Sequence, residues 1–309
     1  MTRFSVVIPA FNRERELPRA VSSCLAQEYP SLEVIVVDDG SNDATVQSVS
    51  GFPDPRLRVI RHTVNRGQGA ARNTGVRSAK GDWVVSLDSD DELLPDALAT
   101  LHRHILRFGD TVERLAFSFE RDDGRISPLP LSPDETLDYA AYVAWLENRE
   151  LWDFLPCARR STFDAVQWAE RHWADHCLYN LDFAARFRTH FCSAAVAHVH
   201  TDAAARMSYR RRTAVVARAT AVELGEYMDC ILQRHGAALR QFAPRTFGMF
   251  LRMRAAYHFL AGERRRGFCE SVAGLRAAPF SVESWGMPLI GLSGPRLFAA
   301  LRAWRPPAT

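Results

Sequence analysis

Two aspartates separated by one residue stand directly after an apolar stretch, in the run Asp88-Ser89-Asp90-Asp91. Residues 83–87 before them are apolar and predict a buried strand. Carboxylates at positions i and i+2 on a turn can converge on one hard divalent cation, because Mg²⁺ and Mn²⁺ take oxygen ligands and share them with phosphates. A solvated acidic loop is the other interpretation. The run therefore predicts a metal site that would neutralise a diphosphate as it leaves.

Asp38 and Asp39 form a second acidic pair at the end of the β-branched stretch 32–37. A carboxylate in this position can accept hydrogen bonds from a base or a ribose hydroxyl, as acidic residues do in nucleotide-binding folds. Ser41 and the two residues after it are also good helix caps. The segment can serve both purposes through different residues.

The segment 65–73 places Arg66, Arg72 and two glycines, Gly67 and Gly69, at the start of a predicted helix. Small residues allow a ligand to approach the backbone, and a helix N-terminus with arginines suits phosphate or base contacts. Close packing of a loop on a helix explains the glycines equally well.

Strands and helices alternate through the first hundred residues. The predicted strands are 4–8, 32–37, 57–61 and 83–87, and the predicted helices are 14–28, 42–50, 67–79 and 95–107. Near-continuous apolar strands joined by helices predict a parallel sheet covered on both faces. Ligands of such sheets bind outside the carboxyl ends of the strands. Polar residues stand at three of these ends: Asn12, Asp38, Asp39, Asp88 and Asp90.

The remaining residues are less regular. We predict a strand at 115–119, a loop at 121–134, helices within 135–150 and 164–190, a strand at 194–197, and helices alone from 213 onward. The six cysteines form no CxxC pair and are read as reduced thiols. No signal peptide and no uncharged stretch of spanning length is recognised, so a cytoplasmic location is expected.

Charge is distributed unevenly along the chain. The net charge is +3, yet residues 201–309 carry 17 arginines and 7 acidic residues, whereas the first two hundred residues are acidic overall. An arginine-rich end can face an anionic partner or simply solvate helical surfaces. Arginines among the tryptophans and leucines of residues 285–304 also suit peripheral contact with an anionic membrane, and packing of these helices on the protein itself is the alternative.

The chain resembles the family 2 glycosyltransferases, which have the GT-A fold. Four segments carry the resemblance, in the family's order: Ser-Val-Val-Ile-Pro-Ala-Phe-Asn at 5–12, Val-Ile-Val-Val-Asp-Asp-Gly-Ser-Asn-Asp at 34–43, Asn-Arg-Gly-Gln-Gly-Ala-Ala-Arg-Asn-Thr-Gly at 65–75 and Leu-Asp-Ser-Asp-Asp-Glu at 87–92. The segments cover about the first third of the chain. The resemblance implies an α/β fold with a mostly parallel sheet between helices, followed by a helical extension.

The resemblance also implies a division of the chain. Residues 1–212 would be the catalytic domain, with a nucleotide-sugar donor half at 1–110 and an acceptor half at 111–212. Residues 213–309 would be the arginine-rich extension.

The resemblance assigns site residues to the donor half. Pro9, Ala10, Phe11 and Asn12 would line the nucleotide pocket. Asp38 and Asp39 would contact the base or ribose, and Arg66 and Arg72 would lie near the donor. Asp88, Ser89 and Asp90 would contact the nucleotide sugar or a Mn²⁺ or Mg²⁺ ion, with Asp90 the better direct metal ligand.

The general base of the family is a carboxylate that starts a helix about ninety residues further on. The matching stretch here is 173–178, where the family's Glu-Asp pair reads Ala174-Asp175. Asp175 is the expected base and Asp182 its substitute. The departure at Ala174 bears on the acceptor side.

His198 and His200 lie two residues apart after the predicted strand 194–197, so strand alternation places both rings on one face. The resemblance implies that His200 can reach the metal or the diphosphate. A structural histidine is the alternative.

The expected function is transfer of a sugar from a nucleotide diphosphate, with UDP the first choice, to an acceptor hydroxyl with inversion. The expected acceptor is a saccharide or a lipid-linked sugar in surface polysaccharide or glycolipid synthesis. A homo-oligomer is compatible with the sequence, and peripheral attachment at the inner face of the cell membrane is allowed for.

Three other classes of function agree less well with the sequence. A metal-dependent sugar nucleotidylyltransferase would need a glycine-rich basic loop after the first strand, which residues 9–12 do not provide. A non-catalytic membrane or polyanion binder would not need Asp88, Asp90 and Asp175. Nucleic acid is not an expected partner, because no recognition module is present.

Overall fold

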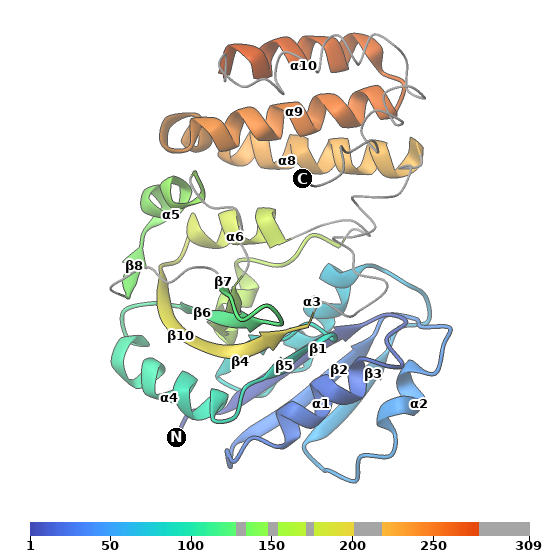
Figure 1. Cartoon of the computed structure of the whole chain (residues 1–309), viewed down its shortest axis with the longest axis vertical. Coiled ribbons are helices and arrows are strands. Elements are labelled where there is room, and N and C mark those ends of the chain that lie inside the picture. Colours follow the sequence, from blue (N-terminus) through green and yellow to red (C-terminus); the bar gives the residue numbers. More distant parts are fainter. Residues whose placement is uncertain (128–133, 148–153, 171–175, 201–217, 278–309) are drawn as a thin grey trace. The chain divides into compact units, whose positions relative to one another are not determined.

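The structure is a computed structural model that describes residues 1–127, 134–147, 154–170, 176–200 and 218–277 (Figure 1). The chain divides into two compact units. The first unit contains residues 1–139 and 150–203, and the second contains residues 140–149 and 204–309. The domain boundary predicted at residue 212 lies outside the described residues.

Four parallel strands form the first half of the sheet. They are β1 (Phe4–Ala10), β2 (Leu32–Asp38), β3 (Leu57–Arg61) and β4 (Trp83–Ser86), in the spatial order β3-β2-β1-β4. The β1–β2 register pairs Ala10 with Asp38, so both strands end at the same level. This register brings the polar residues after each strand to one edge of the sheet, as the sequence predicts.

The second half of the sheet is mixed. Its strands are β5 (Asp91–Leu93), β6 (Arg114–Arg121), β9 (Leu155–Arg159) and β10 (Thr189–Val199), joined by the short strands β7 (Ile126–Ser127) and β8 (Glu135–Leu137). Strand β9 lies antiparallel between β4 and β6, and β10 runs parallel to β6. The α/β class is confirmed, and the antiparallel pairs replace the mostly parallel arrangement beyond β4.

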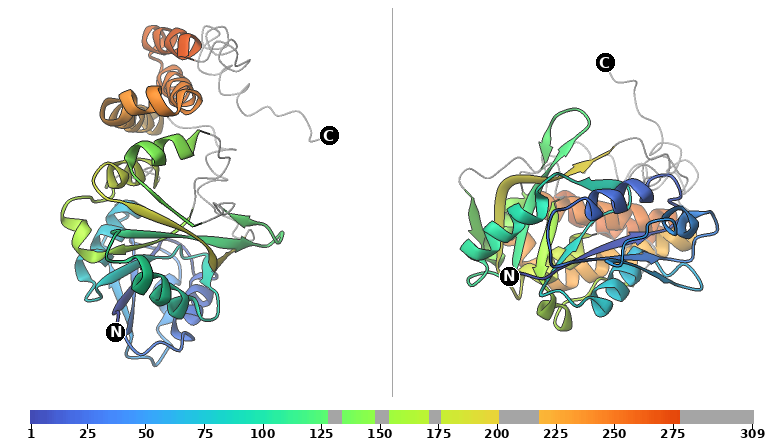
Figure 2. Two further views of the ribbon diagram at one scale, coloured as in Figure 1. Left: turned by 90° about the vertical axis from the view of Figure 1, so that its left-hand side faces the viewer. Right: turned by 90° about the horizontal axis from the view of Figure 1, so that it is seen from below.

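Helices cover both faces of this sheet (Figure 2). Alternate residues of β1 face opposite ways. Val6 and Ile8 pack in one apolar cluster with α1 (Leu17–Leu25) and α4 (Ala97–Phe108). Val7 packs in the other cluster with α3 (Gln68–Ser78) and α6 (His176–Ala184). The helix α2 (Thr45–Val49) and the 3₁₀ helix η1 (Arg160–Asp164) complete this unit among the described residues.

The described part of the second unit is helical. It contains residues 140–149 together with α8 (Arg218–Phe242), α9 (Pro244–Leu260) and α10 (Arg264–Ala277). Most of α5 (Tyr139–Leu146) belongs to it. The carboxylate of Glu147, just after α5, accepts hydrogen bonds from the backbone N–H groups of Arg245 (2.8 Å) and Thr246 (3.0 Å). These donors have no partner inside α9, so Glu147 caps its N-terminus.

Some of the predicted helices and strands agree with the structure and others do not. The first four strands and helices are confirmed within a few residues at their ends, and so is the helical character of residues 218–277. The stretch 135–150 contains β8 before α5, the loop at 121–134 contains β7, and α6 is the α-helix described within 164–190. Strands β5 and β9 were not predicted. Among the described residues, no helix is long and apolar enough to cross a membrane.

Gly75 lets α3 approach the sheet. A Cβ atom at this position would lie 2.3 Å from Val7 Cγ1 and 3.3 Å from Val37 Cγ2. The Gly75→Ala substitution should therefore overpack this face and lower the free energy of unfolding by about 1–3 kcal/mol. Urea unfolding followed by circular dichroism measures the effect.

Gly51→Ala is the matched control, because no atom lies within 4 Å of the added Cβ. Its stability should stay within about 0.5 kcal/mol of the wild type. Equal stabilities of the two variants would contradict the close packing of α3 on β1.

Candidate active site

A buried arginine joins α3 to the end of β4. The guanidinium of Arg72 is on a residue only 2% exposed, and it donates from Nη2 to Asp88 Oδ1 (2.5 Å) and from Nε to Ser86 Oγ (3.1 Å). Gln68 Nε2 donates to the same Asp88 oxygen at 3.3 Å. Asp88 is therefore held in place by two side chains of α3, and the position of Arg72 near the donor stays a prediction.

The three aspartates of the turn converge. Asp88, Asp90 and Asp91 each offer a carboxylate oxygen, and these oxygens lie within 4.8 Å of one another. The turn is closed by a hydrogen bond from Asp91 N to Asp88 O (3.2 Å), and Arg19 of α1 donates to Asp90 O (3.1 Å). An all-oxygen donor set fits a hard cation such as Mg²⁺ or Mn²⁺. Arg72 occupies one oxygen of Asp88, and the prediction that Asp90 is the better direct metal ligand stays a prediction.

Electrostatics keep Asp88 ionised. Burial raises the pKa of Asp88, but the positive charges of Arg72 and His176 outweigh burial and hold the pKa below the ordinary aspartate value. His176 is the first residue of α6, so the start of this helix lies within electrostatic range of the acidic turn. Asp175, the expected base, immediately precedes His176 but lies outside the described residues.

Asp39 organises the neighbouring loop. Its carboxylate accepts hydrogen bonds from the backbone N–H groups of Arg66 (3.0 Å) and Gly67 (2.7 Å), and it lies 2.7 Å from His62 Nδ1. Gly67 has a φ of 93°, in the left-handed region that favours glycine. Asp39 is 3% exposed. Its contact with a base or ribose stays a prediction, and its structural role was not predicted.

Asp38 and Asn12 join the ends of β1 and β2. Asp38 Oδ1 accepts from Ser41 N (3.1 Å), and Arg61 forms an ion pair with Asp38 Oδ2 at 3.0 Å. Asn12 has a φ of 53°, which asparagine tolerates, and its Oδ1 accepts from Asn42 N (3.1 Å).

The other predicted residues of this strand end differ in exposure. Pro9 and Ala10 lie within β1 and are buried, whereas Phe11 is 38% exposed. Phe11 therefore has the most side-chain surface available to a ligand among these three. Ser89, on the acidic turn, is 6% exposed.

The start of α3 is packed against residues 168–170. Arg66 Nη2 donates to Glu170 Oε2 (2.8 Å), and Asn73 exchanges hydrogen bonds with the backbone of Trp168 (both 3.0 Å). A Cβ at Gly69 would lie 2.2 Å from the carbonyl oxygen of Ala169. Close packing therefore explains Gly69, and Glu170 is a partner of this segment that the sequence analysis missed.

His200 lies in a second cluster. Atoms of Asp122, His198 and His200 lie within 4.8 Å of one another, with His198 Nε2 at 2.9 Å from Asp122 Oδ1. His200 Nε2 lies 2.6 Å from Glu92 Oε1. Strand alternation predicted both histidines on one face, whereas their partners Asp122, directly after β6, and Glu92, within β5, were not predicted.

The sheet register places the backbone of His200 near the acidic turn. Strands β10 and β5 are antiparallel, and their last pair joins Val199 to Asp91. His200 follows Val199 directly and Asp90 precedes Asp91 directly, so both stand next to this last pair. The two clusters therefore stand on neighbouring strand ends, and the role of His200 as a metal ligand stays a prediction.

The comparisons with known proteins match the region that forms this site. The family model described as "Glycosyl transferase family 2" matches residues 5–140. This region belongs to glycosyl transferase family 2. It contains β1 to β4 and the acidic turn, so the family resemblance is confirmed, and four of the predicted site segments lie inside the family 2 region.

Curated relatives share parts of this family 2 region. A succinoglycan biosynthesis protein of Rhizobium meliloti is 50% identical over 92 residues, which are 30% of this chain and 26% of the relative. A GalNAc(5)-diNAcBac-PP-undecaprenol beta-1,3-glucosyltransferase of Campylobacter jejuni is 38% identical over 104 residues, 33% of this chain and 34% of the relative. The chain spans well under two thirds of the length of these relatives.

Solved structures are similar in fold over nearly the whole chain. The structure of S. aureus TarS 1-349 in complex with UDP-GlcNAc covers 97% of this chain and 88% of its own, with a TM-score of 0.65 and 19% identity. A mannosyltransferase of Pyrobaculum calidifontis, in complex with GDP-Man and Mn²⁺, covers 98% and 87% with a TM-score of 0.57 and 17% identity. The predicted GT-A fold is thereby confirmed.

Replacing Asp39 by Asn tests its role in the loop. One carboxylate oxygen becomes an NH₂ group, so a buried backbone N–H loses its acceptor and the free energy of unfolding should fall by about 1–3 kcal/mol. Urea unfolding measures this loss.

Asp110→Asn is the matched control, since the Asp110 side chain is fully exposed. Its stability should match that of the wild type. Asp39→Asn with the stability of this control would mean that Asp39 does not support the loop.

Proposed function

We propose that this chain is a glycosyltransferase that moves a sugar from a nucleotide diphosphate to an acceptor hydroxyl with inversion of the anomeric centre. The observation that carries the proposal is the acidic turn at the end of β4, where Arg72 fixes Asp88 and the oxygens of Asp88, Asp90 and Asp91 converge. The family 2 match over the same residues supports it. UDP is the proposed nucleotide.

In the proposed reaction, the acceptor oxygen forms a bond to the anomeric carbon while the bond from this carbon to the diphosphate oxygen breaks. The proton of the acceptor hydroxyl passes to the carboxylate of Asp175, and the nucleoside diphosphate leaves. A bound Mn²⁺ or Mg²⁺ supplies charge neutralisation of the diphosphate. Asp90 and Asp91 would hold the ion, and Asp88, kept ionised beside Arg72, would line the site.

The proposed place of Asp175 rests on its neighbour. His176 begins α6 and acts electrostatically on Asp88, which supports the choice of a base from this part of the chain. Asp182, the substitute, lies within α6 and is partly buried. A base at the start of the helix fits the proposal better.

The acceptor is proposed to be a saccharide or a lipid-linked sugar in surface polysaccharide or glycolipid synthesis. Two relatives support this class of acceptor: the succinoglycan biosynthesis protein of Rhizobium meliloti and the GalNAc(5)-diNAcBac-PP-undecaprenol beta-1,3-glucosyltransferase of Campylobacter jejuni. The location that we propose is the cytoplasm, with peripheral attachment at the inner face of the membrane.

The Asp90→Ala substitution tests whether Asp90 is a metal ligand. Loss of a metal ligand should weaken UDP binding in the presence of Mn²⁺ at least about tenfold and reduce transfer at least about a hundredfold. Calorimetric titration with UDP, GDP and TDP, with and without Mn²⁺, measures binding and also tests the choice of nucleotide. Asp110→Ala is the control. Wild-type turnover of Asp90→Ala would refute the metal assignment.

The same titration decides the role of His200. If His200 is a ligand, His200→Ala should lose Mn²⁺-dependent binding as Asp90→Ala does, whereas His198→Ala should keep it. Equal behaviour of the two histidine variants would remove His200 from the proposed metal ligands.

Asp175→Asn should affect chemistry alone. Loss of the general base should lower the transfer rate by about 10²–10⁴, while the affinity for UDP with Mn²⁺ stays within about twofold of the wild type, because the donor contacts remain. Radiolabelled sugar transfer measures the rate. Asp182→Asn is the control, and loss of transfer in Asp182→Asn with retention in Asp175→Asn would exchange their roles.

A further inference from the structure

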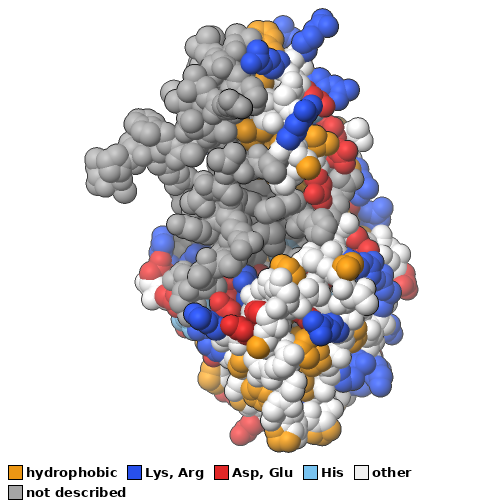
Figure 3. Space-filling view, turned by 90° about the vertical axis from the view of Figure 1, so that its right-hand side faces the viewer, with side chains coloured by type: hydrophobic (Ala, Val, Ile, Leu, Met, Phe, Trp, Pro, Cys, Tyr) orange, Lys and Arg blue, Asp and Glu red, His pale blue; other side chains and the backbone are white. Residues whose placement is uncertain are grey.

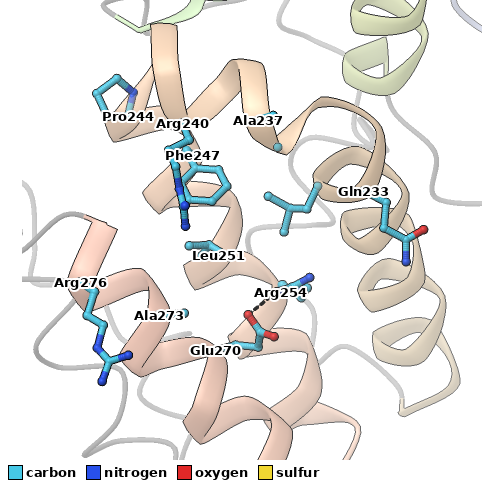
Figure 4. A pocket seen from close by; sticks show the side chains of 12 residues that line it. Gln233, Ala237, Arg240, Pro244, Phe247, Leu251, Arg254, Glu270, Ala273 and Arg276 are labelled. Atoms are coloured by element: carbon cyan, nitrogen blue, oxygen red, sulfur yellow. Dashed lines mark hydrogen bonds and ion pairs between the residues drawn. The ribbon is translucent and has the colours of Figure 1, made fainter.

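A groove runs between α8, α9 and α10 of the second unit (Figure 4). It encloses about 910 Å³, which is the size of sites that take small molecules. Its apolar lining includes Leu232 of α8 and Phe247 and Leu251 of α9, together with small residues. Gly236 and Ala237 leave room on the α8 side. The groove can therefore receive a hydrocarbon group.

Cationic groups lie on the rim of this apolar groove. Arg240 of α8 and Arg276 of α10 both line it and are exposed, and they extend on the same side in the view of Figure 4. The guanidinium of Arg240 lies 5.3 Å from the ring centroid of Phe247, which orients it over the apolar wall. Within the described residues, neither Arg240 nor Arg276 forms an ion pair. With respect to the described residues, both are therefore open to contact with an anion.

The acidic residue in the groove is already engaged. Glu270 forms an ion pair with Arg254, and Arg254 also donates from Nη1 to Asp229 at 3.0 Å. This network of one arginine and two carboxylates carries one net negative charge, so Arg240 and Arg276 still leave the groove with one net positive charge. The groove thus combines an apolar interior with a net positive rim.

The positive charge at the rim favours an occupant of negative charge. Residues 278–309 of this chain carry three arginines and one glutamate, and residues 218–277 carry ten arginines and five acidic residues. The chain's own C-terminal residues and a second copy of this unit would therefore both bring positive charge to a positive rim. An anionic ligand with an apolar chain fits the groove better.

We propose that the groove between α8, α9 and α10 binds a single-chain anionic amphiphile, with its phosphate-like head between Arg240 and Arg276 and its hydrocarbon chain along Phe247 and Leu251. Charge-assisted hydrogen bonds from the guanidinium groups hold the head, and burial of methylene groups holds the chain. This site is separate from the acidic turn and does not depend on the proposed sugar transfer.

The probe is dodecyl phosphate below its critical micelle concentration, titrated calorimetrically into the full chain. Hexyl phosphate should bind at least about tenfold more weakly, because six fewer methylene groups are buried. Dodecyl maltoside should bind at least about tenfold more weakly because it lacks the charge. Inorganic phosphate alone should show no saturable binding.

Two variants test the groove itself. The double substitution Arg240→Gln and Arg276→Gln should weaken dodecyl phosphate binding at least about tenfold, because both charge-assisted contacts are lost. The matched control changes Arg245 and Arg265 to Gln, since both are exposed arginines of the same unit outside the groove. Ala237→Trp should also weaken binding, because the indole fills the groove.

Several outcomes would overturn the proposal. They are equal binding by the Arg240/Arg276 variant and its control, equal binding of dodecyl phosphate and dodecyl maltoside, and binding to phosphatidylglycerol vesicles without binding of the monomeric amphiphile. If Ala237→Trp does not fold, the arginine variants still decide. Asp90→Ala should bind dodecyl phosphate normally, so failure of the donor site and failure of this groove give different results.

Discussion

The parallel half of the sheet depends on the ion pair between Arg72 and Asp88. A guanidinium that is almost fully buried must be paired, because an unpaired charge in the interior is far more costly than a solvated one. Asp88 and Ser86 provide the partners, and both come from the end of β4. The pair therefore ties α3 to β4 and sets the start of the acidic turn. It also occupies one carboxylate oxygen of Asp88.

Polar side chains at the other strand ends of this sheet edge also bind the neighbouring loops. Asn12 after β1 accepts a hydrogen bond from the 41–42 turn after β2, and Asp39 after β2 accepts two from the loop before α3. Helix α3 then supplies Arg72 to the end of β4. Each strand end thus organises the next loop, which gives a structural reason for the four sequence segments to occur together.

The sequence predicted this half well because its signals are local. Apolar strands, helix spacing and turn residues between positions 4 and 108 each lie within one short window, and the structure follows them. Strand β9 escaped prediction because Leu155–Arg159 is short and takes its place between β4 and β6 only through distant pairing. Strand β5 lies inside the acidic motif, which read as a turn.

Contacts between residues far apart in the sequence explain why the rest of the site was not predicted. Glu170, Asp122 and Glu92 stand out by no motif, yet they meet Arg66, His198 and His200 across separations of tens of residues or more. Residue types at strand ends indicate which groups are candidates. Which group meets which follows only from the sheet order, and the mixed half of the sheet was not predicted in detail.

The composition shows an excess of arginine in the second unit, and the structure shows which of these arginines are paired with carboxylates. On the face drawn in Figure 3, blue arginines of this unit alternate with red carboxylates, so a simple solvated surface accounts for part of it. Arg254 lies between two carboxylates, Asp229 and Glu270, and Arg266 is paired with Glu263. Arg240 and Arg276 differ, because they border an apolar groove. The position of Arg240 and Arg276 therefore matters more for binding than the total number of arginines. Two arginines beside a groove that can hold a hydrocarbon chain favour an anionic amphiphile more strongly than a uniformly basic helix would.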